Sequence, residues 1–276
     1  MMFDDGDSSA PGGTAGPGDR PEEKQIIKEG LSEYFIYTIE GTETIPNGWS
    51  KRMRSFESPA VPFAIQYRYR VPEYGDRLVR LYLLKNDKES TLGETPLPDG
   101  MVRVFRNNGR DGLSFLAAQT IKYVPIGDKI ELNLGVDPEV IFEWVKLRAW
   151  RDNIWMRLRG ANVLRRVDDG KVKIEVNSSV AGWDDHGYYT NRIRNYTDKP
   201  IDVEIRRSFS GHVKFRSGLG AKNHDYRTVQ YGARIPPGKK AELRCEIIQL
   251  QGRNRKQENV TIFEAKRSRP GRGRSE

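Results

Sequence analysis

The chain has little of several residue types on which common folds and reactions depend. It has one cysteine among 276 residues, so no internal disulfide can form. It has no run of roughly 18 apolar residues, the length that a membrane-spanning helix needs. The acidic, glycine-rich start has no apolar segment of the kind that secretory signals carry, so we expect either a cytoplasmic protein or a longer precursor whose start is missing here. A disulfide scaffold and a helical membrane span are therefore not expected.

Sequence signatures of catalysis are also missing. The chain contains no His-Glu-x-x-His, no Gly-x-Ser-x-Gly, no phosphate-binding loop and no dinucleotide fingerprint. Cys245 alternates with Leu243 and Ile247 on one face of a predicted strand, and no base lies beside it in the sequence. We therefore expect Cys245 to be a small core residue rather than a nucleophile, and we expect no cofactor.

The two ends of the chain differ from the rest in composition and from each other in charge. Residues 1–23 hold one Arg against six Asp or Glu, and residues 266–276 hold five Lys or Arg against one Glu. Both stretches are rich in Gly, Pro or Ser and poor in aliphatic residues, so they cannot bury enough surface to offset the entropy of ordering. The sequence predicts a disordered acidic leader over 1–25 and a disordered basic tail over 266–276.

Alternation of apolar and polar residues is the strongest pattern between these ends. After a turn rich in Asn, Thr, Asp and Pro, the residues Ile201, Val203 and Ile205 share one face of a strand and Glu204 lies on the other. This pattern predicts that Ile205 is buried and that Glu204 faces solvent. Replacing Ile205 by Asp should be costly, and replacing Glu204 by Ala should cost less than about 1 kcal/mol.

The same alternation recurs in short runs that are separated by turn residues. Such runs are typical of sandwiches and barrels, so we expect an all-β protein with antiparallel β-sandwich architecture. The Asn-Asn-Gly and Asp-Gly signals near residues 107–112 predict a β-hairpin there. The expected strands include 33–40, 60–71, 77–85, 101–105, 113–124, 128–134, 171–177, 201–209 and 241–250.

One segment fits two secondary structures. Asp137, Pro138 and Glu139 form a typical helix start, and Val140, Trp144 and Leu147 then follow at helical spacing. Val145, Leu147 and Ala149 also alternate with cationic residues, as in a strand. The local pattern favours neither.

The order of several motifs resembles a known family. EYFIYTIEGTETIPNGWS is followed by PFAIQYRYRV, then by MVRVFRNNGRDGLSFLAAQTIKYV with DKIELNLGVDPEV, and last by the turn and strand over 195–206 and by IPPGKKAEL. This order is similar to the C-terminal domain of mucoidy-inhibitor-A-like proteins. The resemblance spans roughly residues 30–265 and implies strands after Asp137. Family members usually carry a further N-terminal domain and a coiled coil, and the family has no established catalytic residues to carry over.

Two groups of residues are candidates for chemistry or binding. The first comprises the clustered ligand-type residues Asp184, Asp185, His186, His224 and Asp225. Carboxylates and imidazoles in this combination suit a metal site or an acid–base pair. Asp residues at such loops also commonly close turns, which is the simpler interpretation.

The second group is a basic stripe in which tryptophans alternate with cations. Aromatic and cationic side chains together suit an anionic polymer such as nucleic acid, although Trp rings packed under Arg stems give the same pattern. The stripe consists of Trp144, Lys146, Arg148, Trp150, Arg151, Trp155, Arg157 and Arg159.

The leading hypothesis is a non-catalytic interaction module with a protein partner. It would comprise an N-terminal β subdomain over 26–140 and an immunoglobulin-like β-sandwich over 141–265. The alternatives are a metal-binding or hydrolytic enzyme that uses Asp184, Asp185, His186 and His224, and a polyanion-binding protein that uses the basic stripe.

Overall fold

The computed structural model describes residues 26–31, 34–39, 41–42, 44–51, 54, 56–93, 95–110, 112–158, 164–167 and 178–265. The chain divides into two compact units, Met1–Pro59 and Ala60–Glu276. In the first unit, β1 (Ile26–Leu31) pairs with β2 (Tyr34–Ile39) in an antiparallel hairpin. The leader over 1–25, the tail over 266–276 and the strand expected over 171–177 lie outside the described residues.

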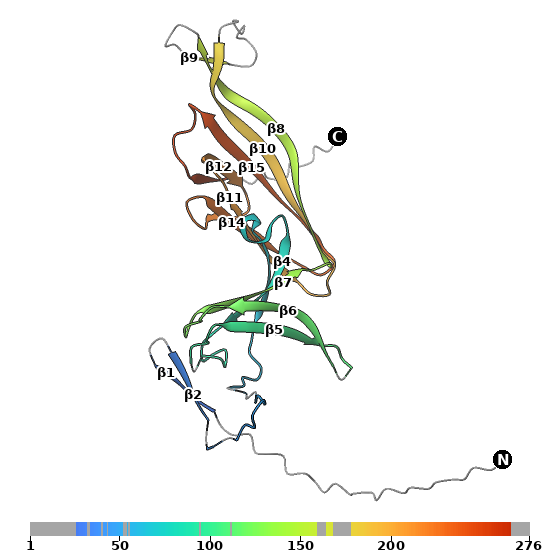
Figure 1. The fold of residues 1–276 in the computed structure, drawn as a ribbon. Coiled ribbons are helices and arrows are strands. Elements are labelled where there is room, and N and C mark those ends of the chain that lie inside the picture. The colour runs from blue at the N-terminus through green and yellow to red at the C-terminus, as the bar shows by residue number, and fades with distance from the viewer. Residues whose placement is uncertain are drawn as a thin grey trace, which may run out of the picture. The chain divides into compact units, whose positions relative to one another are not determined.

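The second unit contains two six-stranded sheets, and we call them the first and the second sheet (Figure 1). The first sheet has the order β16 (Val260–Glu264), β12 (His212–Ser217), β15 (Lys240–Gly252), β10 (Ser178–Asn195), β8 (Val140–Leu158) and β9 (Leu164–Val167). The second has the order β13 (Lys222–Asn223), β14 (Thr228–Ile235), β11 (Ile201–Ser208), β3 (Ala64–Tyr69), β4 (Leu78–Lys85) and β7 (Lys129–Val136).

Most strand pairs in the described part of the chain are antiparallel, as the alternation predicts, but two of them are parallel. These are β11 with β3 and β12 with β16. The helix α1 (Val71–Tyr74) is a single turn with Pro72 near its start, and among the described residues no helix is long and apolar enough to cross a membrane. The all-β sandwich expected from the sequence is confirmed.

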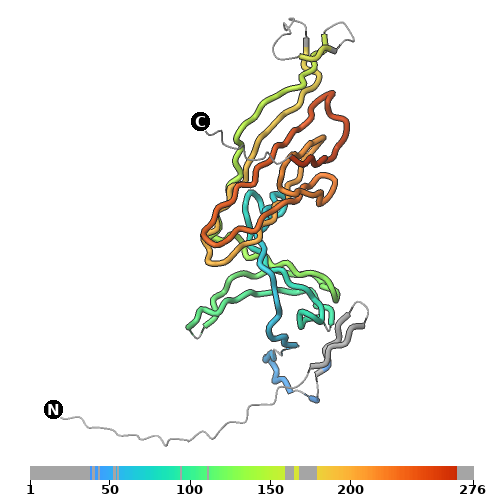
Figure 2. Tube along the Cα trace, turned by 180° about the vertical axis from the view of Figure 1, so that it is seen from behind, coloured from blue at the N-terminus to red at the C-terminus, as the bar shows by residue number. Residues whose placement is uncertain are grey.

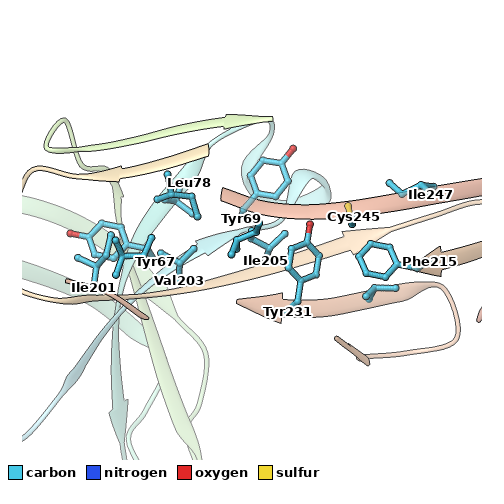
Figure 3. Close-up of a cluster of buried hydrophobic side chains, with 14 of the residues drawn as sticks. Tyr67, Tyr69, Leu78, Ile201, Val203, Ile205, Phe215, Tyr231, Cys245 and Ile247 are labelled. Carbon is cyan, nitrogen blue, oxygen red and sulfur yellow. The ribbon is translucent and has the colours of Figure 1, made fainter. Parts of the chain in front are cut away.

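The core lies between the two sheets and is built from the inward residues of both (Figure 3). Ile205 and Phe215 are fully buried there, on β11 and β12 respectively, which confirms the strand register predicted for Ile205. Cys245 is a free cysteine in the same cluster, as expected. Burial raises the pKa of its thiol to about 12. The thiol is therefore protonated at neutral pH.

The segment after Asp137 forms a strand, β8, that is 19 residues long. The side chain of Asp137 is used in the interior and does not cap a helix: its carboxylate accepts hydrogen bonds from Tyr67 at 2.6 Å and from Arg80 at 2.9 Å. β8 then pairs with β10 along nearly its whole length, and Figure 2 shows the two running side by side. This long antiparallel pairing decides between the two local patterns in favour of the strand.

The boundary expected near residue 140 does not coincide with the division into compact units, which falls between Pro59 and Ala60. Strands from both sides of residue 140 share one sheet, because β3 pairs with β11 through residues such as Tyr67 and Val203. Alternation could not reveal this pairing, since it reports the face of a residue and not the partner strand.

The turn between β10 and β11 connects the first sheet to the second. Asn195 donates from Nδ2 to the carbonyls of Lys199 at 2.8 Å and of Ile235 at 3.1 Å. Its Oδ1 accepts from the backbone nitrogen of Thr197 at 3.0 Å. The Asn-rich turn in the sequence therefore closes the edge of the sandwich and is not a hairpin loop within one sheet.

The face of the second sheet that points away from the core carries a buried ionic network. Arg68 donates from Nε to Glu204 at 2.8 Å and from Nη1 to Glu131 at 2.6 Å. Gln230 donates to the other oxygen of Glu204 at 2.6 Å. Glu204 is only 9% exposed, so the prediction that it faces solvent is wrong. It does lie opposite Ile205 in the alternation, but a guanidinium from β3 covers it.

A separate two-stranded sheet is formed by β5 (Gly100–Asn107) and β6 (Leu113–Ile121), at the predicted hairpin. One face packs against a second, smaller core, in which Val102 and Val104 contact the cluster of Leu97, Val124, Ile130 and Leu132. The side chain of Gln119 continues the contact by accepting from the backbone nitrogen of Asn133 on β7 at 2.8 Å. The hairpin is thus fixed to the edge of the second sheet.

Candidate functional site

The first sheet has an inner face, which contributes to the core, and an outer face. Cys245 and Ile247 of β15 point inward, so Glu246 and Ile248 point outward. Cross-strand partners lie on the same side of a sheet, and therefore Tyr188 and His186 of β10 share the outer face with them. The other outer residues on β8 and β12 are Arg148, Trp150, Asp152, His212, Lys214 and Arg216.

His186 lies at the centre of this outer face, between two carboxylates. Its Nδ1 is 3.0 Å from Glu246 Oε1 and its Nε2 is 2.9 Å from Asp152 Oδ1. An imidazolium donates to both carboxylates, whereas a neutral ring donates to only one of them. The ring stacks on Trp150 with centroids 4.7 Å apart, and the Arg148 guanidinium lies 4.9 Å from the Trp150 centroid. His186 is held on three sides, and its side chain is 10% exposed.

Asp184 is committed to a β-bulge beside this histidine. Asn153 has a positive φ of 47°, a left-handed conformation that Asn tolerates better than most residues. Asn153 donates to Asp184 Oδ2 at 3.2 Å, and Asn254 donates to Asp184 Oδ1 at 2.8 Å. Asn254 also donates to the carbonyl of Asn153 at 2.9 Å. The carboxylate of Asp184 therefore joins the irregular part of β8 to the turn after β15.

Asp185 points to the opposite face from His186. It accepts from Arg151 Nε at 2.6 Å and from Trp183 Nε1 at 2.9 Å. Burial alone would raise the pKa of Asp185, but these two hydrogen bonds and the charge of Arg151 outweigh it and lower the pKa. On this side a pocket of about 470 Å³ is lined by Arg151, Asp185, Gln249 and neighbouring residues.

The structure does not bring the two histidine groups into one site. His224 follows β13 in the second sheet, and its backbone nitrogen donates to the carbonyl of Thr228 at 2.8 Å. Asp225 Oδ1 accepts from the backbone nitrogen of Arg227 at 2.8 Å, which is the turn-closing role of the simpler interpretation. Within the described ranges, no group of three or more His, Cys, Asp or Glu residues could hold a metal ion.

The basic stripe is divided between the two faces of β8. Trp144 packs inward, where its ring stacks on Tyr189 at 4.8 Å and the Arg207 guanidinium lies 3.9 Å from its centroid. Lys146 shares the face of Trp144 and lies over Tyr189, 5.6 Å from its centroid. A register shift between Tyr188 and Tyr189 then changes the alternation from Arg148 onward. Arg148 and Trp150 point outward and Arg151 inward, so the members described do not form one continuous surface. Arg159 lies outside the described residues.

Two pockets on the outer face adjoin each other, and their lining cations come from three strands, β8, β9 and β12, and from the turn after β15. Their volumes are about 380 Å³ and 760 Å³, and both are lined by Asn153, Asp184 and Lys214. Arg166 of β9 and Arg216 of β12 line the larger pocket. Arg253 and Lys256, from the turn after β15, line the smaller one together with Trp155. Cations therefore outnumber the two lining carboxylates, Asp152 and Asp184.

Lys214 is the cation shared by both pockets, and no carboxylate of the described residues forms an ion pair with it. Burial and the charge of Lys214 together lower the pKa of the neighbouring His212. His212 Nδ1 accepts from the backbone nitrogen of Lys256 at 3.3 Å. His212 lies on the same face of β12 as Lys214, whose ammonium has no carboxylate partner among the residues described. This part of the face is therefore suitable for a carboxylate or a phosphate, and less suitable for a cation.

No protein-family model, no curated protein and no solved structure matches the chain. Sequence reasoning found His186 but missed its partners Asp152 and Glu246, and it missed Lys214 and Lys256. The signal for Lys214 was the cation in the alternating run HVKFR, in which Val213 and Phe215 are core residues. The pairing of β12 with β15, which brings Lys214 beside Ile248, has no local signature.

Proposed function

We propose that the chain is a non-catalytic binding module and that an acidic surface of a partner protein contacts the outer face of the first sheet. The observation that carries this proposal is Lys214, which has no ion-pair partner among the described carboxylates. It lines two adjoining pockets with Arg166, Arg253, Lys256 and Arg216, of which Arg216 also pairs with Glu246 at 2.8 Å. Complementary charge of this kind steers association and fixes orientation. We also propose that residues 141–265 form an immunoglobulin-like domain and that the chain is related to mucoidy-inhibitor-A-like proteins.

The surroundings of His186 suit a binding surface better than a catalytic general base. A general base needs a free nitrogen within hydrogen-bond reach of a substrate. Both ring nitrogens of His186 already face carboxylates, and Trp150 covers one side of the ring. In our interpretation the stack of Arg148, Trp150 and His186 supports a flat surface on which the partner lies.

The test uses poly-L-glutamate as a probe of acidic protein surface and measures its dissociation constant by fluorescence anisotropy. The site variant carries Lys214→Glu and Lys256→Glu. The control variant carries Lys129→Glu and Lys222→Glu, which change the charge equally on exposed positions of the second sheet. We expect the site variant to bind about tenfold more weakly and the control to stay within about twofold of the unmodified protein.

Equal losses in the two variants would overturn the proposal, because net charge alone would then explain binding. A second arm uses single-stranded DNA of matched charge. If the DNA binds about tenfold more tightly than poly-L-glutamate and loses that affinity in the site variant, the polyanion alternative replaces the acidic protein partner.

A further inference from the structure

The β5–β6 hairpin lies outside the first sheet and has a strand edge that the described residues leave unpaired. β5 and β6 form a sheet of two strands, and none of the described strands pairs with the other edge of β5. Figure 1 shows the pair as a separate ribbon. A strand at an edge presents alternate backbone N–H and C=O groups that can pair with another chain.

The hairpin also exposes an apolar face next to this edge. Met101 is 62% exposed, Phe105 48%, Leu113 70% and Phe115 58%. Met101 and Phe105 alternate with Val102 and Val104, which pack on the smaller core. Phe105 and Phe115 are cross-strand partners whose ring centroids are 5.6 Å apart. One face of the hairpin is thus anchored and the other is left uncovered by the residues described.

The charge of the hairpin distinguishes between occupants. It carries Arg103, Arg106 and Arg110, and no acid of the described residues forms an ion pair with any of them. A second copy that paired with β5 through a twofold axis would bring the arginines of two strands together, and like charges opposite each other are destabilising. The occupant that fits carries negative charge.

The turn holds the hairpin in a fixed conformation. Asn107 Oδ1 accepts from the backbone nitrogen of Gly109 at 2.8 Å, and Asn108 Oδ1 accepts from that of Arg110 at 2.8 Å. Gly109 has a φ of 74°, which glycine adopts without strain. A strand edge that is already ordered costs a binding partner less entropy than one that must be ordered on binding.

We infer that β5 receives an extended segment of a partner protein as an added strand, with a carboxylate between two apolar residues at alternate positions. The carboxylate would lie beside Arg103, and the flanking apolar side chains would lie beside Met101 and Phe105. Backbone hydrogen bonds to β5 would supply affinity, and these three side chains would supply the sequence preference.

The test uses two synthetic peptides, acetyl-Ser-Val-Thr-Glu-Thr-Val-Ser-amide and the same peptide with Lys in place of Glu. Hydrogen exchange measures protection of the β5 amides, and anisotropy measures the dissociation constants. The unmodified protein should prefer the Glu peptide by about tenfold, and the Arg103→Glu variant should prefer the Lys peptide by a similar factor. Arg103 is exposed, so the variant should fold.

The control variant is Arg110→Glu, which makes the same charge change in the turn of the same hairpin and not on β5. It should keep the preference for the Glu peptide. The inference is overturned if neither peptide protects β5 amides at about 1 mM, or if Arg110→Glu reverses the preference as well. Binding of vesicles of phosphatidylserine and phosphatidylcholine through the hairpin, or dimerisation that Arg103→Glu abolishes, would also overturn it in favour of a membrane or of a second copy.

Discussion

The outer faces of the two sheets both carry charged side chains, but they differ in how those charges are compensated. On the second sheet, Arg68 is 3% exposed, and all of its guanidinium nitrogens donate to Glu204, Glu131 or Gln66. On the first sheet, Lys214 has no carboxylate partner of that kind among the residues described and lines two pockets. A charge that is buried and compensated contributes to the fold, whereas an uncompensated charge beside a pocket is available to a partner.

The largest effect is expected where a charge enters the core that both faces cover. Ile205 is fully buried between the sheets, so Ile205→Asp places an unpaired carboxylate among apolar side chains. We expect the free energy of unfolding to fall by more than about 3 kcal/mol in urea titrations. The matched control is Asp202→Ala on the same strand, whose side chain is 59% exposed, and it should change stability by less than about 0.5 kcal/mol. Similar losses in both would show that the strand register is wrong.

The next largest effect is expected from removing one carboxylate of the ionic network on the second sheet. Glu204→Ala leaves the nearly buried Arg68 with one carboxylate in place of two, and it removes the acceptor of Gln230. We expect a loss of about 3 kcal/mol, because removing one partner of a buried ion pair leaves a charge without compensation. The double variant with Arg68→Met should lose less than the sum of the two single losses, as measured in a double-mutant cycle. Additive losses would contradict the network.

A pH effect follows from the core thiol. Burial raises the pKa of Cys245 from 9.0 to about 12, so the folded state holds its proton at pH values where the unfolded state releases it. The free energy of unfolding should therefore fall as the pH rises from about 9 to about 12. A disulfide reagent such as dithionitrobenzoate at pH 8 should react with the denatured protein and leave the native protein unmodified. Rapid reaction of the native thiol would refute its protection.

The smallest effect on stability is expected at Lys214, on the outer face of the first sheet. Lys214→Ala removes a cation that has no ion-pair partner among the described carboxylates, so the midpoint of urea unfolding should shift by an amount worth less than about 0.5 kcal/mol. The same change should weaken capture of poly-L-glutamate. A large loss of stability would assign Lys214 to the fold and would remove the contrast between the two faces.

The sequence predicted which face of a strand points into the core, but it did not predict which side chains from other strands lie against the opposite face. Alternation placed Ile205 and Cys245 in the core, because burial of one side of a strand repeats every two residues. It could not predict that Glu204 is buried, because the covering guanidinium comes from Arg68, 136 residues away. The long antiparallel pairing of β8 with β10 resolved the ambiguity after Asp137, where local spacing could not.

The candidate site shows the same limit. Asp184, Asp185 and His186 are adjacent in the sequence and point to alternate faces. Each therefore binds a different partner, and the three do not form one metal site. The stripe of tryptophans and cations was divided in the same way by the alternation and by a register shift at Tyr188. Lys214 and Lys256 come together only through strand pairing and a turn, and neither of these follows from spacing.

The turn at Asn195 has a consequence for the order in which the chain folds. One of its hydrogen bonds, to the carbonyl of Lys199, closes within a few residues and can form early. Another, to the carbonyl of Ile235, spans 40 residues and requires β14 to be in place. Contacts of high sequence separation form late when the intervening loop must first be closed. The side chain of Asn195 therefore takes part both in the early closure of the turn and in the later docking of β14. Its replacement by Ala should speed unfolding more than it slows refolding, which stopped-flow kinetics can measure.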